Sequence, residues 1–315
     1  AGAVRVGAGL SVKALVIGYG SIGQRHVRLL TELGCQIAIV SRRSIDFAPR
    51  YSDLTQALAD WQPEYVVVAN RTSEHHQATQ FLIKHDFQGR VLVEKPLYDH
   101  PSALPRNGFA LAAVAYNLRC HPLLTKLKCL LDDSAQLVTA NIYAGSYLPD
   151  WRPNIDYRQS YSAKRAQGGG VLRDLSHELD YALWLFGPWR RLTASGGRLG
   201  PLEIDSDDAY TLLMETQRCP LVSIHLNYLD RVPRREILVN TDQHTVRVDL
   251  INNTIAIDGV RESVTVARDD TYRAEHQAMM SGNAEGLCTL EEAMETLVTI
   301  EAAERVAASH VWIAR

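Results

Sequence analysis

The residues that decide the fold are Val12-Lys13-Ala14-Leu15-Val16-Ile17-Gly18-Tyr19-Gly20-Ser21-Ile22-Gly23, followed by a helical apolar pattern to about Leu33 and by the run Gln36–Val40. The short apolar run predicts a buried strand, and the spaced apolar residues after the glycines predict a helix. Gln36–Val40 predicts a second strand. This order of strand, glycine turn, helix and strand is typical of the start of a dinucleotide-binding domain.

The glycines of this turn suit a bound pyrophosphate. Gly18 permits a tight turn, Gly20 lets the backbone approach the ligand, and Gly23 lets the helix pack closely on the strand. Ser21 and Ile22 begin the helix, whose N-terminus attracts negative charge. We therefore expect all five residues to bind a dinucleotide. A glycine turn in some other α/β protein is the alternative.

The end of the second strand indicates which dinucleotide is preferred. A site for NAD has an Asp or Glu here, which accepts hydrogen bonds from the ribose and would repel a 2′-phosphate. This chain has Ser41, Arg42 and Arg43 instead. Arginine guanidinium groups and serine hydroxyls donate hydrogen bonds to phosphate oxygens. The sequence therefore predicts NADP(H) in preference to NAD(H), with an ordinary solvated arginine pair as the alternative.

Length and composition favour a two-domain globular protein. The chain has 315 residues, of which 46% are hydrophobic and 22% are charged, and its net charge is −3. That charge gives no electrostatic basis for binding nucleic acid or an anionic membrane. No apolar run reaches the roughly 18 residues of a membrane span. We expect a dinucleotide-binding domain over residues 1–118 and a substrate-binding and oligomerisation domain over residues 119–315.

Residues 1–11 and the cysteines bear on the cellular location of the protein. Residues 1–11 are rich in Ala and Gly, are broken by Arg5 and lack the apolar core of a signal peptide, so we expect a flexible or expression-derived start. The five cysteines are scattered and contain no C-x-x-C pair, which argues against a disulfide framework or a zinc site. We expect a cytoplasmic protein without a metal.

The pattern of strands and helices changes near residue 118. Before it, apolar strands near 64–69, 90–93 and 110–115 alternate with helices, which predicts a parallel sheet. After it, strands follow closely from about 208 to 267, with helices near 123–131, 170–186, 271–282 and 289–308. Alternation of apolar and polar residues through 222–228 predicts a sheet with one covered and one more polar face. The expected fold is α/β: a Rossmann domain followed by an α+β domain with a large, mostly antiparallel sheet.

Three further motifs identify a family resemblance. Glu94-Lys95-Pro96 follows the fourth strand, His75 follows Asn70-Arg71-Thr72-Ser73-Glu74, and Gly168-Gly169-Gly170 opens a helix that contains Asp174, His177 and Asp180. With the glycine turn, these motifs resemble the Gfo/Idh/MocA oxidoreductases along nearly the whole chain. The stretch from Tyr147 to Ala163 is similar to a subgroup associated with bacterial surface-polysaccharide sugars.

The resemblance implies a catalytic group made of Lys95, His177 and Asp174. A histidine is suited to removing the proton of an alcohol near neutral pH, and a lysine ammonium stabilises developing alkoxide charge. Asp174 stands three residues before His177, a spacing that places both on one helix face. The commoner family spacing is four. A helix face that is solvated or salt-bridged with Arg173 is the alternative for Asp174, His177 and Asp180.

The resemblance also implies binding residues. Asn70, His75, Glu94 and Lys95 would lie along the cofactor, although His75 is also explained as an exposed histidine at a helix start. Tyr116 and Asn117 would lie close to the nicotinamide and the substrate. Aromatic and arginine side chains of the following loop could line a polar substrate pocket, or the loop could simply pack across the cleft: Trp151, Arg152, Tyr157, Arg158 and Tyr161.

We therefore expect an NADP(H)-dependent oxidoreductase that acts on a secondary alcohol or ketone of a sugar, sugar acid or sugar nucleotide. The alternatives are an NAD-dependent glycosidase of the same fold and a non-catalytic dinucleotide-sensing regulator. A polar outer sheet face bearing Ser223, His225 and Asn227 predicts pairing with a second copy, in a homodimer or homotetramer.

Overall fold

The computed structural model describes residues 11–309 and 311–315. The start expected over residues 1–11 falls almost wholly on residues 1–10, which lie outside the described residues. The chain forms two compact units. The first contains the described residues up to Leu97, with Pro105–Ala115 and Tyr272–Leu287, and the second contains Tyr98–Leu104, Tyr116–Thr271 and the described residues from Cys288 onward. The change of unit between Ala115 and Tyr116 lies close to the expected boundary at residue 118, while Tyr98–Leu104 groups with the second unit and Tyr272–Leu287 with the first.

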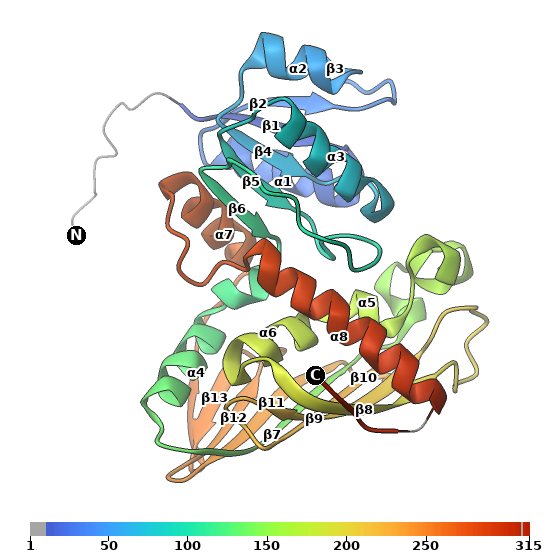
Figure 1. Ribbon diagram of the computed structural model, residues 1–315, viewed down its shortest axis with the longest axis vertical. Helices are drawn as coiled ribbons and strands as arrows, with labels where there is room; N and C mark the ends of the chain where they lie inside the picture. Colours follow the sequence, from blue (N-terminus) through green and yellow to red (C-terminus); the bar gives the residue numbers. More distant parts are fainter. Residues whose placement is uncertain (1–10, 310) are drawn as a thin grey trace. The chain divides into compact units, whose positions relative to one another are not determined.

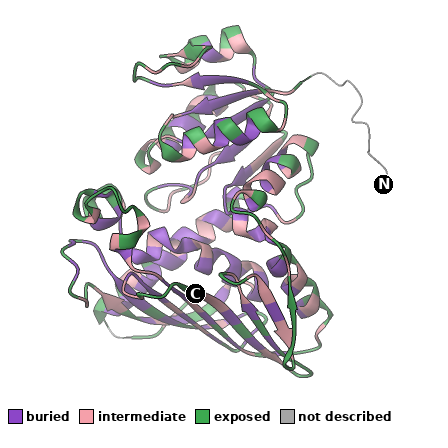
Figure 2. Cartoon of the chain, turned by 180° about the vertical axis from the view of Figure 1, so that it is seen from behind, coloured by how far each residue is buried: buried purple, intermediate pink, exposed green. Residues whose placement is uncertain are grey.

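The first unit is built on a parallel sheet with the strand order β3-β2-β1-β4-β5-β6 (Figure 1). Its strands are β1 (Lys13–Ile17), β2 (Gln36–Val40), β3 (Arg50–Tyr51), β4 (Tyr65–Val68), β5 (Arg90–Val93) and β6 (Leu111–Val114). Its helices are α1 (Ser21–Glu32), α2 (Leu54–Trp61), α3 (Thr72–Lys84) and most of α7 (Asp270–Ser281). The central strands are almost wholly buried (Figure 2), as a sheet covered on both faces requires.

This strand order places the glycine turn at the usual binding edge of such a sheet. The chain runs outward from β1 to β2 on one side and returns to β4 on the other. Ligands of open parallel sheets bind beyond the carboxyl ends of the strands at such a reversal. The turn after β1 and the residues after β4 therefore share this edge.

The second unit is built on a nine-stranded sheet with the order β14-β13-β12-β11-β7-β10-β9-β8-β15. The strands are β7 (Leu137–Gly145), β8 (Trp189–Gly197), β9 (Ala209–Thr216), β10 (Leu221–Asn227), β11 (Arg234–Thr241), β12 (Thr245–Asp249), β13 (Thr254–Ile257), β14 (Val260–Ser263) and β15 (Ile313–Ala314). Strands β7 and β10 pair in parallel, and the other described pairings are antiparallel. The expected α/β fold with a parallel sheet and a mostly antiparallel sheet is confirmed.

Helices and short 3₁₀ turns complete the second unit. The helices are α4 (Pro122–Asp133), α5 (Val171–Asp174), α6 (Ser176–Phe186) and α8 (Leu290–Ser309). The 3₁₀ turns are η1 (Asn117–Cys120), η2 (Leu148–Trp151), η3 (Tyr157–Gln159), η4 (Tyr161–Ala163) and η5 (Arg165–Gln167). Within the described ranges, we find no helix that combines the length and the apolar character needed to cross a lipid bilayer.

The helix expected over residues 170–186 is interrupted. Leu175 leaves the helical conformation, with φ −97° and ψ 31°, and separates α5 from α6. Asp174 and His177 therefore lie on different helices, so the prediction that they share one helix face is wrong. The apolar residues expected to hold this segment down are nevertheless buried: Leu172, Leu175, Leu179, Leu183 and Phe186.

The sheet face predicted to be polar alternates as expected along most of β10. Val222, Ile224 and Leu226 are buried, while Ser223 and His225 are partly exposed. Asn227 was expected on the outer face but is buried. Its side-chain oxygen accepts backbone N–H bonds from the turn that follows the strand, which explains the difference.

Candidate active site

The glycine turn of the first unit is shaped by two close backbone approaches. Gly18 has φ +98°, and a Cβ there would lie 2.6 Å from the carbonyl oxygen of Ala69. A Cβ on Gly23 would lie 2.2 Å from the carbonyl oxygen of Gly18. A Cβ on Gly20 would meet nothing within 4 Å, so the surface at the start of α1 is open. This combination leaves room for a ligand at a helix N-terminus.

Asn70 lies beside this turn and supports the fit to a dinucleotide. A Cβ on Gly18 would come within 2.7 Å of the Asn70 backbone. The Asn70 side-chain nitrogen donates to Glu74 Oε2 at 3.3 Å, but its buried Oδ1 has no hydrogen-bond partner among the described residues. Buried polar atoms are normally paired, so such an atom next to a glycine cradle fits the place of a bound ligand.

The side chain of Arg50, on strand β3, reaches the segment with Arg42 and Arg43 that follows β2. The Ser41 hydroxyl accepts a hydrogen bond from the backbone N–H of Arg43 at 3.2 Å. Arg50, which the sequence analysis missed, donates to the carbonyl oxygens of Ser41 and Arg43 at 3.1 and 3.3 Å. Arg42 is 81% exposed at its side chain, and its Nη2 lies 3.6 Å from Glu74 Oε1. Arg50 therefore shapes the turn, while Arg42 remains accessible.

Glu94 fixes the backbone at the Glu-Lys-Pro motif. Its buried carboxylate accepts a hydrogen bond from the backbone N–H of Lys95 at 3.0 Å and lies 2.8 Å from Nε2 of His26. Burial opposes the charged form, but the hydrogen bond from His26 and the positive charge of Lys95 outweigh it and lower the pKa of Glu94. The Lys95 side chain is half-buried. Glu94 was expected along the cofactor, and these contacts show how it holds Lys95.

His75 braces the segment that follows Lys95. The interpretation of His75 as an exposed helix-start residue is wrong, because the ring is almost fully buried. Its Nδ1 lies 3.1 Å from the carbonyl oxygen of Pro96 and 3.2 Å from that of Leu97. Burial lowers the pKa of His75, which favours a neutral ring that donates to these carbonyls.

In the second unit, four of the predicted residues gather around a tyrosine that the sequence did not reveal. The hydroxyl of Tyr228 donates to the buried carboxylate of Asp174 at 2.6 Å, and Trp151 meets the Tyr228 ring edge-on at 5.3 Å between centroids. The guanidinium of Arg152 lies 5.4 Å from the centroid of the Tyr161 ring. Tyr161 is 43% exposed as a residue, but the covered surroundings of its hydroxyl and the negative charge of Asp174 raise its pKa. Asp174 is thus surrounded by aromatic side chains from the loop and from the end of β10.

His177 lies at the start of α6 against another predicted residue. Its ring meets that of Tyr116 edge-on at 5.5 Å, and the Tyr116 hydroxyl lies 3.4 Å from Oγ of Ser176. Tyr116 is buried and His177 is only partly covered. The buried tyrosine therefore supports one side of an imidazole that keeps some exposed surface.

Three other predicted substrate residues have structural partners instead. Asn117 is buried and donates to Oγ1 of Thr271 at 2.6 Å. The Tyr157 hydroxyl accepts the backbone N–H of Glu203, and the Arg158 guanidinium pairs with Asp156 and Glu203. The contacts of Tyr157 and Arg158 are of the kind expected where the loop packs on its neighbours.

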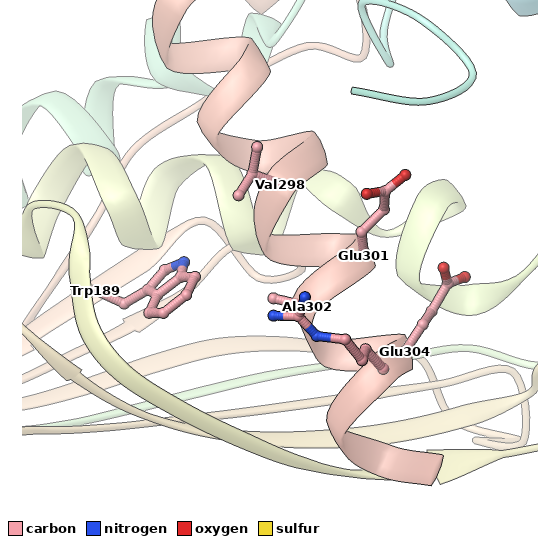
Figure 3. Close-up of a pocket in the computed structure, with 6 residues that line it drawn as sticks. Trp189, Val298, Glu301, Ala302 and Glu304 are labelled. Atoms are coloured by element: carbon pink, nitrogen blue, oxygen red, sulfur yellow. The ribbon is translucent and has the colours of Figure 1, made fainter. Parts of the chain in front are cut away.

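The loop does not enclose a sugar-sized space by itself. Its side chains line a cavity of about 10 Å³, which is room for about one water: Leu148, Trp151, Arg152, Ile155, Tyr157, Ser160 and Ser162. A larger cavity of about 510 Å³ lies between Trp189 and the outer face of α8 (Figure 3). Its lining consists of Trp189, Val298, Glu301, Ala302, Glu304 and Arg305, and includes no residue of the predicted site.

Asp180, the last acidic residue of the motif, has a structural partner. Arg119 donates to both of its carboxylate oxygens, at 2.9 and 2.8 Å, with both side chains almost fully buried. Arg119 also pairs with Glu292 at 2.9 Å. The salt-bridged alternative therefore describes Asp180, but its partner is Arg119, whereas the expected Arg173 pairs with Glu304.

The comparisons with known proteins agree with this fold. Residues 12–111 match the oxidoreductase family with an NAD-binding Rossmann fold, and residues 136–247 match the GFO/IDH/MocA C-terminal domain. Two matched regions of one family cover about two thirds of the chain. The protein belongs to the Gfo/Idh/MocA family and is an NAD-binding oxidoreductase. No match was found among curated proteins.

Solved structures share the whole fold at low identity. GenD2 from gentamicin A biosynthesis, in complex with NAD, is 21% identical with a TM-score of 0.78, and the match covers 97% of this chain and 96% of that one. The WlbA dehydrogenase from Bordetella pertussis, in complex with NADH and UDP-GlcNAcA, is 17% identical with a TM-score of 0.75 and coverage of 97% and 99%. Levoglucosan dehydrogenase in complex with NADH is 14% identical with a TM-score of 0.82 and coverage of 97% and 99%.

Proposed function

We propose that this protein is an NADP(H)-preferring dehydrogenase or reductase of a secondary alcohol or ketone in a sugar, sugar acid or sugar nucleotide. The observation that carries this proposal is that one chain presents the glycine cradle, the held Lys95 and the aromatic surroundings of Asp174. The substrate class is supported by the ligands named for similar structures, UDP-GlcNAcA for WlbA and L-sorbose for levoglucosan dehydrogenase.

Lys95 and His177 are the proposed catalytic residues. When bound, the nicotinamide accepts or supplies the hydride at the reacting carbon. In the oxidation direction, His177 removes the hydroxyl proton, and the Lys95 ammonium stabilises the negative charge that develops on the oxygen. In reduction the same groups act in reverse, with His177 returning the proton.

Asp174 has a lesser role in this proposal. Its carboxylate accepts the hydroxyl of Tyr228, and it lies on α5 while His177 lies on α6. We propose that Asp174 holds Tyr228 and the neighbouring loop aromatics around the substrate. Asp174→Asn should therefore reduce turnover less than removal of Lys95 or His177.

The proposed preference for NADP(H) rests on the end of β2. Ser41, Arg42 and Arg43 offer donors and positive charge where an NAD site has a carboxylate. The similar structures named above were solved with NAD or NADH, so this preference would set the present chain apart from them.

Assembly and location are further parts of the proposal. A row of side chains crosses four strands of the outer sheet face: Leu238, Asn141, Ser223 and Leu213. Both leucines are more than one third exposed. Burying this face against a second copy in a homodimer or homotetramer would remove them from water. The scattered cysteines support a cytoplasmic location.

The function is tested by turnover with a panel of free sugars, sugar acids and sugar nucleotides, each with NADP and with NAD. Formation of reduced nicotinamide is followed, and Lys95→Ala serves as the inactive control. Turnover of at least one panel member that is lost in Lys95→Ala supports the proposal. Release of a sugar without net change in the nicotinamide would instead support a glycosidase.

A further inference from the structure

Four buried polar side chains form a continuous row through the first unit. The hydroxyl of Tyr65 lies 2.9 Å from Nδ1 of His276, and Nε2 of His276 lies 2.9 Å from Nδ1 of His26. Nε2 of His26 lies 2.8 Å from the carboxylate of Glu94. Tyr65, His26 and His276 are completely buried, and Glu94 is nearly so. The row joins α7, α1, β4 and the end of β5.

The donor and the acceptor of each bond follow from the chemistry of the row. The Glu94 carboxylate can only accept, so Nε2 of His26 donates to it. A neutral His26 then has a bare Nδ1, which accepts from Nε2–H of His276. Nδ1 of His276 is bare in turn and accepts the hydroxyl of Tyr65. Every bond is satisfied when both imidazoles are neutral and carry their proton on Nε2. A protonated His26 would instead reverse the bond between the two histidines and the bond to Tyr65.

The surroundings favour a neutral His276 and a protonated Tyr65 hydroxyl. Burial lowers the pKa of His276 well below its ordinary value, so that its ring stays neutral. Burial raises the pKa of Tyr65 well above its ordinary value, so that it remains a donor. Glu275, Cys35 and Arg90 are the charged and titratable groups that act on Tyr65. On the side of His26, the ring of Tyr272 packs edge-on against the imidazole and the guanidinium of Arg25 lies over the Tyr272 ring.

The row ends at the backbone of Lys95. One Glu94 oxygen takes the hydrogen bond of His26 while the other accepts the N–H of Lys95 at 3.0 Å. The Glu94 N–H itself donates to Val68 in the sheet. Moving or rotating the Glu94 carboxylate would therefore release the peptide of Lys95 while leaving the strand intact.

We propose that Tyr65, His276, His26 and Glu94 form a hydrogen-bonded network of fixed donor direction that positions Lys95, so that α7 supports the catalytic lysine. These four are positioning residues, and their link to catalysis rests on the role proposed above for Lys95. The same network lets a residue far along the chain, His276, control the geometry of the Glu-Lys-Pro motif.

The donor direction is tested on the whole unmodified protein by NMR of ¹⁵N-labelled histidines. Two-bond couplings between the ring nitrogens and the carbon-bound ring protons distinguish the two neutral tautomers from each other and from the cation. The variants His26→Phe and His276→Phe assign the two signals among those of the 11 histidines. Both rings should be neutral with the proton on Nε2 near pH 7. A cation or a proton on Nδ1 in either ring would overturn the proposal.

The link to Lys95 is tested by hydrogen exchange followed by mass spectrometry. Pro96 has no N–H, so a peptide over residues 92–96, whose first two residues lose their label, reports only the amides of Glu94 and Lys95. His26→Phe keeps a buried ring but removes the donor to Glu94, and it should speed exchange of the Lys95 amide by about tenfold or more. His276→Phe should have a smaller effect in the same direction. The matched control is His85→Phe, because His85 donates only to the carbonyl of Phe81 within its own helix.

The outcomes separate this proposal from the proposed function. If His26→Phe lowers Tm but leaves Lys95 exchange unchanged, the network is structural only and the proposal fails. If exchange changes as expected while Lys95→Ala keeps full turnover, the network stands and the catalytic role of Lys95 fails. With a substrate from the panel, His26→Phe should lower kcat by about tenfold or more while the Kd of NADPH changes less than twofold.

Discussion

Replacement of Arg42 by alanine should remove most of the preference for NADPH over NADH. Arg50 donates to the backbone carbonyls of Ser41 and Arg43, so it shapes the turn and has little freedom to bind a phosphate. Arg42 is 81% exposed, and its guanidinium meets only the weak attraction of Glu74 at 3.6 Å. It can therefore turn toward a 2′-phosphate, which NADH lacks.

The magnitude follows from the exposure of Arg42. A hydrogen bond to a charged group contributes about 1.5–3 kcal/mol, and an exposed site with a competing carboxylate belongs at the lower end. About 1.5 kcal/mol corresponds to roughly tenfold in Kd. Arg42→Ala should weaken NADPH binding about tenfold and leave NADH within about twofold. Glu74→Gln frees Arg42 and should tighten NADPH binding by a few-fold.

The assay is a calorimetric titration of each cofactor at low and at high salt. The NADPH preference should shrink as salt rises, because the Debye length falls from about 10 Å at 0.1 M to about 3 Å at 1 M. Arg28→Ala is the matched control, because Arg28 pairs with Glu32 on the outer surface of α1. Equal affinities of the unmodified protein for NADPH and NADH would refute the reasoning, although the oxidoreductase assignment would stand.

Four further predictions concern catalysis, assembly and stability. Lys95→Ala and His177→Ala should each lower kcat by about 10²-fold or more while NADPH binding changes little; turnover within a few-fold of the unmodified enzyme would exclude that residue from proton transfer. The protein should be a dimer or tetramer by light scattering, and Leu213→Glu should dissociate it; a monomeric unmodified protein contradicts this. Arg119→Met leaves the buried Asp180 carboxylate without its arginine and should lower the free energy of unfolding, measured by urea denaturation, by about 3–5 kcal/mol. A decrease of less than about 1 kcal/mol would mean that this ion pair contributes little to stability. Folding lowers the pKa of His276, so the unfolded chain binds more protons than the folded one. The free energy of unfolding, measured by urea denaturation, should therefore fall as the pH drops below about 6.5. His276→Gln should weaken this dependence on pH.

The local parts of the fold could be predicted from the sequence. The strand, glycine turn and helix after Val12 depend on residues within a short stretch, and steric contacts within the turn itself require Gly23. Alternating burial along β10 follows from the period of two of a strand, so that Val222, Ile224 and Leu226 face inward. The Glu94-Lys95-Pro96 motif and the segments that contain His75 and His177 indicated the family because each is a short local pattern and the three follow in a set order along the chain.

Features that depend on distant partners could not be predicted. The break at Leu175 is one example, because the apolar spacing through this segment suits one continuous helix equally well. The placement of α7 in the first unit is a second example, because the sequence of residues 272–287 does not indicate which of the two sheets they pack against. The pairing of Arg119 with Asp180 likewise depends on which of many arginines the fold brings near.

The sequence by itself thus determined the two kinds of sheet, the dinucleotide-binding turn and the candidate residues Lys95 and His177. Only the tertiary structure decided what holds them. His26 and His276 are 250 positions apart, and His26 and Glu94 are 68 apart. Hydrogen bonds between residues so far apart leave no periodic pattern in the sequence. Their partners are selected by burial in a shared core and not by proximity along the chain.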